Sequence, residues 1–260
     1  DRPGSGVRRR RSPAPLVKVR GLFRLREWPR DPAERAAYVD SVFGTIAPKY
    51  DLVSRLLSSW QDRRWKARAL SALPQNGSCQ RLLDLATGTG AFPILLRRRG
   101  FMGKIVGLDR NRAMLALAGR KCGARIRLIQ GDLARLPFTD SSFDAVTMGY
   151  GLRYVEDTRE TLKEIYRLLR PGGVFVSLDF GLPDNWWYRR VCLGYLLFFG
   201  TLWGLILHGR RETYWHIVES LRAYPGQRAL ARWMEEAGFT DVRLMEQLGG
   251  ISVIARGIRR

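Results

Sequence analysis

The stretch LLDLATGTG, residues 82–90, decides the fold. An apolar strand runs into a glycine-rich turn, and a helical segment follows. Gly88 and Gly90 can adopt unusual backbone angles, and the N–H groups at the start of the helix face the crevice that the turn leaves open. The stretch is not the dinucleotide-binding fingerprint, because Pro93 occupies the third glycine position counted from Gly88. It predicts a ligand-binding turn at the carboxyl end of a first parallel strand.

Short apolar runs alternate with segments of helical length on both sides of this turn. The runs are Arg81–Ala86, Lys104–Leu108, Ile126–Ile129, Phe143–Met148 and Val174–Asp179. Such alternation predicts an α/β fold with a doubly wound, Rossmann-like and mostly parallel sheet. A helix is expected over Gly226–Ala237, and strands over 241–247 and 251–255 predict a closing antiparallel hairpin at the sheet edge. Residues 33–75 have helical periodicity and predict an N-terminal helical cap.

Acidic residues follow three of the predicted strands. Asp84 lies in the first strand, Asp109 ends the second, and Asp132 follows the third. An acid at the end of the second strand can accept hydrogen bonds from both hydroxyls of a ribose. Each acid taken singly can also be a solvated turn residue. Three acidic strand ends without a basic phosphate clamp favour a nucleoside that carries no pyrophosphate, and S-adenosylmethionine is such a ligand.

The 260 residues contain 45 Lys and Arg against 24 Asp and Glu, a formal net charge of +21. This excess predicts attraction to an anionic partner, whether nucleic acid, phospholipid headgroups or a phosphorylated ligand. Residues 1–32 are rich in Arg, Pro, Gly and Ser and predict a basic, disordered leader or a transit remnant, ahead of a single domain over residues 33–257. Three cysteines at wide spacing and two histidines argue against a disulfide framework or a metal site.

An apolar insert is expected over residues 185–225. Val191 to Leu207 is a run without charge, bracketed by Arg189-Arg190 and Arg210-Arg211, and four tryptophans lie in or beside it. The run is near the lower limit for crossing a bilayer. Three interpretations stay open: an interfacial helix or lipid-tail pocket, an ordinary buried helix, and a true membrane span.

With these motifs in hand, the chain resembles the ubiquinone/menaquinone biosynthesis C-methyltransferases, a family of class I S-adenosylmethionine-dependent methyltransferases. The similarity runs from about Val42 to Gly257. It includes FGTIAPKYD at 43–51, DLATGTG at 84–90, GD at 131–132 with LPF at 136–138, SFDAVTMGYGLR at 142–153, RLLRPGG at 167–173, SLRAYP at 220–225 and GGI at 249–251.

The resemblance implies transfer of a methyl group from S-adenosylmethionine to a ring carbon of a prenylated quinol, a demethylmenaquinol or a related demethyl-benzoquinol. Arg153 and Tyr50 would be the catalytic residues, with no metal needed. Asp84, Gly88 and Gly90 would line the methionine side of the cofactor. Asp109 would hold the ribose, and Asp132 with Leu133 the adenine. A structural alternative for Arg153 is an ion pair with Glu156 or Asp157, and for Tyr50 a packed position in the helical cap.

The chain departs from the family pattern at several positions. The family usually has Asn at Tyr154, His at Asp62, Met-Asn at Val53-Ser54, and Glu-x-Ser at residues 179–181. These departures concern the substrate more than the cofactor. Two other functions therefore stay open, a noncatalytic cofactor-binding membrane subunit and a nucleic-acid methyltransferase or binder. The expected location is cytoplasmic and peripheral to the membrane, or organellar if the leader is a transit remnant, and a homo-oligomer or a quinone-biosynthesis complex is an expected assembly.

Overall fold

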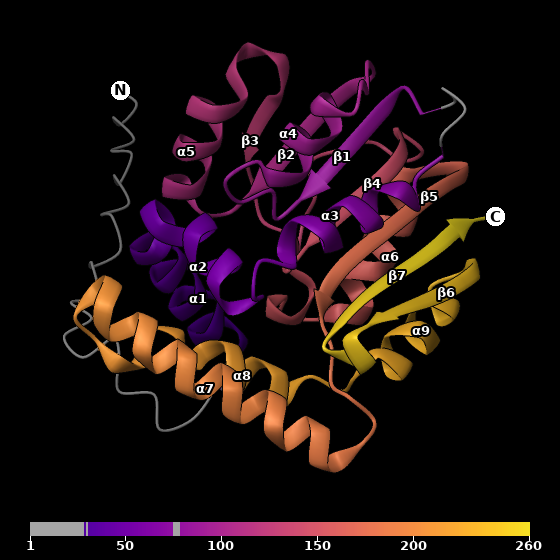
Figure 1. Ribbon diagram of the computed structural model, residues 1–260. Helices are drawn as coiled ribbons and strands as arrows, with labels where there is room; N and C mark the ends of the chain where they lie inside the picture. Colours follow the sequence, from indigo (N-terminus) through magenta and orange to yellow (C-terminus); the bar gives the residue numbers. More distant parts are fainter. Residues whose placement is uncertain (1–28, 30, 75–78) are drawn as a thin grey trace, which may run out of the picture.

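The structure, a computed structural model, describes residues 29, 31–74 and 79–260. A seven-stranded sheet forms its centre, in the order β3-β2-β1-β4-β5-β7-β6. Six strands run in one direction and β7 runs antiparallel to both of its neighbours. The strands are β1 (Arg81–Leu85), β2 (Lys104–Asp109), β3 (Arg127–Gln130), β4 (Phe143–Gly149), β5 (Leu169–Phe180), β6 (Phe239–Gln247) and β7 (Ser252–Arg259). The predicted doubly wound sheet with its antiparallel edge is confirmed (Figure 1).

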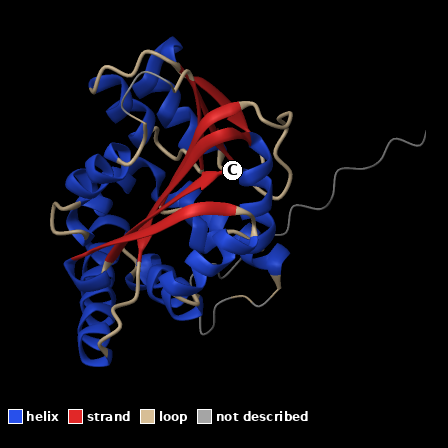
Figure 2. Ribbon diagram, turned by 90° about the vertical axis from the view of Figure 1, so that its right-hand side faces the viewer, coloured by secondary structure: helices blue, strands red, loops and turns tan. Residues whose placement is uncertain are grey.

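Helices cover both faces of the sheet (Figure 2). They are α1 (Pro32–Ile46), α2 (Tyr50–Leu57), α3 (Asp62–Ser71), α4 (Ala91–Arg98), α5 (Arg112–Cys122), α6 (Thr158–Leu168), α7 (Trp186–His208), α8 (Trp215–Ala223) and α9 (Gln227–Glu236). Short 3-10 turns include η1 (Ala47–Lys49), η4 (Arg211–Tyr214) and η5 (Leu248–Gly250). Leader residues 1–28 lie outside the described part of the chain.

Two hydrophobic cores lie on the two faces of the sheet. Successive strand residues point to opposite faces, so that Leu82 belongs to one core and Leu83 to the other. The first core holds the residues of the cap helices, α7 and α8, and the second is closed by α6 and α9. The cap and the insert therefore share one face, and they meet where α2 contacts α7.

Strand β5 differs from its prediction. It begins at Leu169 and not at Val174, because Leu169 already pairs with Phe143 before the register shifts between Phe143 and Ala145. Pro171 and Gly172 therefore lie inside the strand as an irregularity, with Gly172 at φ 78°. The closing strand is also longer than predicted, since β7 continues to Arg259.

The apolar run of the insert forms most of α7, a helix long and apolar enough to cross a membrane by length and composition. Only 17% of its most apolar 18-residue window is buried, so the interpretation as an ordinary buried helix is wrong. One face of α7 packs closely on the chain that follows it. A Cβ on Gly204 would lie 2.5 Å from the carbonyl oxygen of Arg210, so only glycine permits this approach.

Candidate active site

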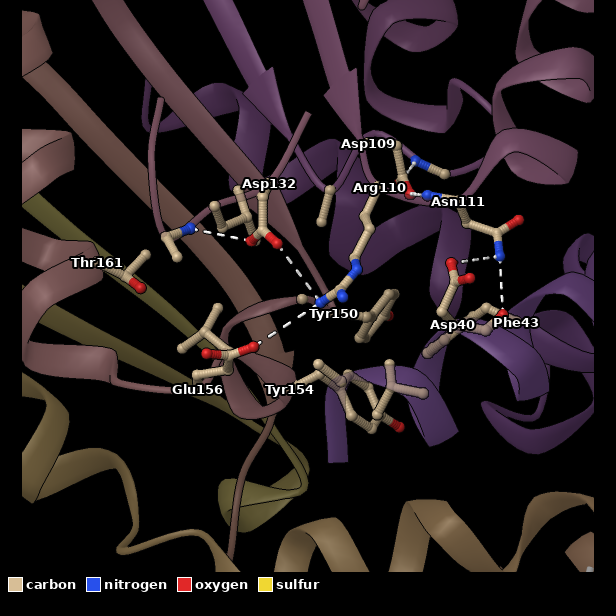
Figure 3. A pocket seen from close by; sticks show the side chains of 18 of the residues that line it. Asp40, Phe43, Asp109, Arg110, Asn111, Asp132, Tyr150, Tyr154, Glu156 and Thr161 are labelled. Atoms are coloured by element: carbon tan, nitrogen blue, oxygen red, sulfur yellow. Dashed lines mark hydrogen bonds and ion pairs between the residues drawn. The ribbon is translucent and has the colours of Figure 1, made fainter. Parts of the chain in front are cut away.

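A cavity of about 230 Å³ opens at the carboxyl ends of β1, β2, β3 and β4, and Asp40 and Phe43 of α1 line one side of it (Figure 3). Every parallel strand delivers the loop that follows it to this edge, which is why residues far apart in sequence meet here. Its lining includes Gly88, Asp109, Asp132, Leu133 and Tyr150. Of the predicted cofactor residues, the sheet thus brings Gly88, Asp109, Asp132 and Leu133 together around one cavity.

Asp109 is held in place by backbone donors on both sides. The N–H of Gly88 donates to its Oδ2 over 2.7 Å, and the N–H of Asn111 donates to its Oδ1 over 2.8 Å. Burial raises the pKa of Asp109, and these two backbone hydrogen bonds oppose that rise. The positive φ of Gly88, 54°, turns its N–H toward the carboxylate. The remaining lone pairs of Asp109 are available to hydroxyl groups in the cavity.

Asp132 lies at the more open side of the cavity. Its Oδ2 is 3.5 Å from Nη1 of Arg110, which is also 3.8 Å from Oε1 of Glu156, so that Arg110 joins two loops (Figure 3). These side chains are about half exposed. Sequence reasoning missed Arg110, because nothing in its immediate neighbourhood distinguishes it from other surface arginines.

Asp84 lines a neighbouring hollow of about 30 Å³ with Gly88 and Lys66, and not the main cavity. Its two oxygens accept hydrogen bonds of 2.6 Å from the hydroxyls of Thr87 and Thr147. Burial raises the pKa of Asp84 to about 7. Nζ of Lys66 is 2.8 Å from Oδ2 of Asp62, a buried ion pair that places a cation in the same hollow. This hollow can take the zwitterionic end of an amino acid.

Gly90 lines none of the hollows described here. A Cβ at this position would lie 2.5 Å from Sγ of Cys122 in α5, and its φ is 81°. The glycine is therefore required for close packing between the turn and α5, and its place beside the cofactor stays a prediction.

A third hollow, of about 40 Å³, is lined mainly by apolar and aromatic side chains of the cap and of α8. Arg153 and His216 are its basic residues. Tyr50 and Tyr150 line this hollow, the small hollow beside Asp84 and the main cavity alike. The predicted catalytic Tyr50 thus stands at the junction of the polar and the apolar parts of the site.

All the nitrogens of the Arg153 guanidinium have partners. Nη1 pairs with Oδ1 of Asp179, Nε donates to Oγ of Ser220 over 3.2 Å, and Nη2 donates to the hydroxyl of Tyr154 over 3.0 Å. The guanidinium also lies over the rings of Tyr154 and Phe180, at 4.6 and 5.2 Å from their centroids. The alternative partners expected from the sequence, Glu156 and Asp157, are wrong, because Arg153 turns inward to Asp179 on β5.

Burial raises the pKa of Tyr50 well above its ordinary value, and the nearby Asp62 charge adds to the rise. Tyr50 is therefore a phenol at neutral pH and can donate a proton in a hydrogen bond, but it is not a phenolate base. Burial lowers the pKa of His216 to about 3, which keeps the ring neutral. Nδ1 of His216 lies 3.0 Å from the carbonyl oxygen of Thr213 and must donate to it, which leaves Nε2 as an acceptor.

Two further residues of the site escaped sequence reasoning. Asp51 accepts a 2.6 Å hydrogen bond from the hydroxyl of Thr89 and pairs with Lys121, so it fastens α2 to the glycine-rich turn and to α5. His216 carried no local signal, since the apolar segment around it resembles any buried helix. Its place beside Arg153 depends on α8 folding back over the cap.

The geometry fits S-adenosylmethionine. Asp109 presents a carboxylate to the main cavity, the hollow beside Asp84 presents charges of both signs, and Gly88 allows close approach of a ligand to the backbone. The hydroxyl of Tyr150 and Oδ1 of Asp62 are both buried on this side of the site, and burial together with the Asp62 carboxylate raises the pKa of Tyr150. Within residues 31–74 and 79–260, no cluster of three or more His, Cys, Asp or Glu side chains is arranged to hold a metal ion.

Curated relatives agree with this geometry. The chain is 39% identical to the demethylmenaquinone methyltransferase of Thermus thermophilus, over 84% of this chain and 100% of that protein. It is 40% identical to the demethylmenaquinone methyltransferase of Deinococcus radiodurans, over 80% of this chain and 88% of that one. It is 37% identical to the ubiquinone/menaquinone biosynthesis C-methyltransferase UbiE of Methylobacterium nodulans, over 86% of this chain and 91% of that one.

Solved structures share the fold at low sequence identity. A SAM-dependent methyltransferase of Thermotoga maritima superposes with a TM-score of 0.61 at 19% identity, over 85% of this chain and 99% of that one. Phosphoethanolamine N-methyltransferase 2 of Haemonchus contortus, in complex with S-adenosyl-L-methionine, superposes with a TM-score of 0.53 at 20% identity. The match covers 71% of this chain and 38% of that one. Residues 32–259 match the ubiE/COQ5 methyltransferase family, and with the cofactor geometry above the chain belongs to this family of S-adenosylmethionine-dependent methyltransferases.

Proposed function

We propose that this chain methylates a ring carbon of a prenylated quinol, with a demethylmenaquinol or a demethyl-benzoquinol as the acceptor. One observation carries the proposal: Tyr50 and Tyr150 form a wall shared by the polar cofactor cavity and the aromatic hollow that contains Arg153. A planar ring in that hollow would lie next to the cofactor. The names of the curated relatives support the same class of acceptor.

Bound S-adenosylmethionine supplies an electrophilic methyl group. The chain's own residues have to bind the ring, turn the reacting carbon toward that group and exclude water. Arg153 is a cation fixed by three partners, so it can stabilise an anionic ring oxygen without rearranging. The hydroxyl of Tyr50 can donate to the same oxygen. Positioning of two reactants in this way accounts for roughly 7–11 kcal/mol of barrier lowering.

We assign to His216 the acceptance of a hydrogen bond from the quinol hydroxyl. A guanidinium keeps its charge in proteins, so Arg153 cannot accept a proton, and Tyr50 is already protonated. The pKa of His216 is lowered to about 3, so its neutral ring can orient the hydroxyl through Nε2 but is too weak a base to hold the proton. As electron density shifts to the ring carbon, the hydroxyl proton would pass to water, and Arg153 would stabilise the negative charge on the ring oxygen.

Tyr154 is compatible with this assignment although the family usually has Asn there. Its hydroxyl accepts from Nη2 of Arg153, and its ring packs edge-on against Phe43 at 5.3 Å. Tyr154 therefore helps to hold the Arg153 guanidinium in place, and having Tyr where the family usually has Asn does not remove that cation. The noncatalytic alternative becomes an outcome of the experiment below.

The test incubates purified full-length chain in detergent with labelled S-adenosylmethionine and reduced demethylmenaquinol, with a demethyl-benzoquinol in parallel. We expect a product heavier by one methyl group from at least one ring. His216→Asn is expected to lower kcat by about tenfold while cofactor affinity is unchanged, because a hydrogen bond to the quinol hydroxyl is lost. Met102→Ala, on an exposed loop distant from the site, is the control. Cofactor binding without turnover on either ring would overturn the proposal and support the noncatalytic alternative.

A further inference from the structure

The outward face of α7 is apolar, which is unusual for a surface helix. Trp187, Val191 and Phe198 are 64%, 63% and 64% exposed, and with Gly194 and Leu205 they follow one another at spacings of three, four or seven residues. They therefore form one stripe along the helix. The opposite side, with Leu196, Gly200 and Gly204, packs on the protein. Both sides of α7 are thus apolar, and only one of them is covered by described residues (Figure 1).

Two neighbouring elements extend this stripe on one flank of the helix. The hydroxyls of Ser59 and Tyr195 are 2.8 Å apart, which brings Trp60, 62% exposed, beside α7. The hydroxyl of Tyr188 donates to the carbonyl oxygen of Leu248 over 3.1 Å, which brings the exposed Leu248 beside its first half. Tyr188 and Tyr195 are seven residues apart and lie on the same side of the helix. We call the resulting surface the α7 face: Trp60, Trp186, Trp187, Val191, Phe198, Leu205, Ile206 and Leu248.

Trp60 and Leu248, both exposed and apolar, also have backbone conformations that L-residues rarely adopt. Their φ angles are 65° and 48°. Turn positions of this kind favour Gly, Asn or Asp, and a bulky apolar residue there gains nothing from the fold that would offset the strain. Both lie on the α7 face, which indicates that the exposed side chains serve a contact outside the chain.

We infer that the α7 face docks on the surface of an anionic lipid bilayer, with α7 lying in the plane of the membrane. Residues 186–208 contain no acidic residue, and pairs of arginines at 189–190 and 210–211 stand at the two ends of the apolar stripe. Trp186 and Trp187 stack at 4.4 Å at the start of the helix. Exposed tryptophans with flanking arginines match the boundary between acyl chains and anionic headgroups.

The packing of α7 argues for an in-plane helix and against a span. The chain turns back at Gly209, and η4 and α8 pack along α7. A helix that crossed the bilayer in this fold would carry Arg210, Arg211 and Glu212 of the packed return segment with it, and charged groups within the hydrocarbon are costly. Nζ of Lys49 also donates to the carbonyl oxygen of Leu207 over 2.5 Å, which fastens the end of α7 to the helical cap.

The docked face also adjoins the proposed acceptor site. The inner side of α7 contributes Leu193, Phe199 and Leu207 to one of the two hydrophobic cores. The same core contains Val53, Leu57 and Ile217, which line the aromatic hollow. A bilayer against α7 would therefore lie one helix away from the hollow. The choice of a bilayer as occupant rests in part on the proposed function, because a prenyl tail is dissolved in lipid.

The experiment measures co-flotation of the full chain with vesicles of phosphatidylglycerol and phosphatidylcholine, without any quinol. We expect binding to the anionic vesicles that Phe198→Glu weakens about tenfold or more. Met102→Glu adds the same charge at a residue 89% exposed on the loop between α4 and β2, and it should change binding less than about twofold. Phe198→Ser, which removes the ring without adding charge, should also weaken binding.

Several outcomes would overturn the inference. If Phe198→Glu and Met102→Glu change vesicle binding by the same factor, the basic leader or another face binds lipid. A stable dimer in solution that Phe198→Glu dissociates, with no vesicle binding, would identify a second copy as the occupant. Turnover of a quinol in detergent is assayed on the same variants and is expected to be unchanged, so failure of docking and failure of the proposed reaction are separate results.

Discussion

The two halves of the site are built on different principles. The cofactor half is polar, lies at the ends of β1, β2 and β4, and is held mainly by hydrogen bonds between neighbouring loops, such as those to Asp109. The insert half is aromatic, and its one cation, Arg153, is fully enclosed by residues from β5, α8 and its own loop. Under the proposed function, one reactant would be recognised through an exposed polar edge and the other through a closed apolar wall.

The largest expected effect is on the free energy of unfolding, when one ion pair from each half of the site is broken. The side chains of Arg153 and Asp179 are 4% and 7% exposed, whereas those of Arg110 and Asp132 are 46% and 47% exposed. Arg153→Met leaves a buried carboxylate unpaired and should lower the free energy of unfolding by about 3–5 kcal/mol. Arg110→Met should cost less than about 1 kcal/mol. Urea denaturation measures both, and equal losses would contradict the contrast. Arg153→Met/Asp179→Leu should recover part of the stability.

Cofactor affinity should depend on the polar edge alone. Asp109→Ala removes an acceptor and leaves the N–H groups of Gly88 and Asn111 without their partners, so we expect S-adenosylmethionine to bind about 100-fold more weakly. Asp132→Ala, at a half-exposed position, should weaken binding by less than about tenfold. His216→Asn should leave it unchanged. Calorimetric titration gives the three dissociation constants. A comparable loss for His216→Asn would show that the halves are not independent.

The two halves should respond to pH with opposite sign. The pKa of Asp84 is raised to about 7, so the folded state binds the extra proton and stability falls as pH rises from about 4 to about 7. The pKa of His216 is lowered to about 3, so the unfolded state binds the extra proton and stability rises with pH from about 3 to about 6.5. Each slope is at most about 1.4 kcal/mol per pH unit. Asp84→Asn should therefore steepen the rise of stability between pH 4 and 6.5, and His216→Asn should flatten it. Thermal denaturation across this pH range measures how stability changes with pH in each variant. If both substitutions change that slope in the same direction, the opposite pKa shifts of Asp84 and His216 are wrong.

The smallest effects test how the insert is packed. A Cβ at Gly204 would lie 2.5 Å from a backbone oxygen, whereas a Cβ at Gly194 meets no atom within 4 Å. Gly204→Ala should destabilise the protein by about 1–3 kcal/mol, because the return segment must shift. Gly194→Ala, in the exposed stripe of α7, should stabilise it by about 1 kcal/mol through helix propensity. The opposite signs are the result to look for in denaturation midpoints. Stabilisation by both substitutions would mean that α7 is not packed on its return segment.

The sheet and the polar edge of the cavity could be predicted from sequence patterns. The glycine-rich turn, the acidic strand ends and the alternation of strand and helix are local patterns, because backbone geometry at a βα turn is set by the residues within it. Asp109, Asp132 and Gly88 were predictable for that reason, and the resemblance to a family supplied Arg153 and Tyr50 as candidates. Gly90 shows the limit of such reasoning: its close packing on Cys122 of α5 could not be predicted from the turn itself.

The aromatic half of the site depends on contacts between segments that are distant in sequence. Arg153 pairs with Asp179, 26 residues away in sequence, and lies against Ser220, 67 residues away. His216 joins the same hollow because α8 folds back over the cap, and the covered side of α7 is set by what packs against it. An apolar run that is uncharged on every side has no periodicity from which its buried face can be read. Burial depends on which segments meet, and the meeting of segments distant in sequence is a property of the folded chain.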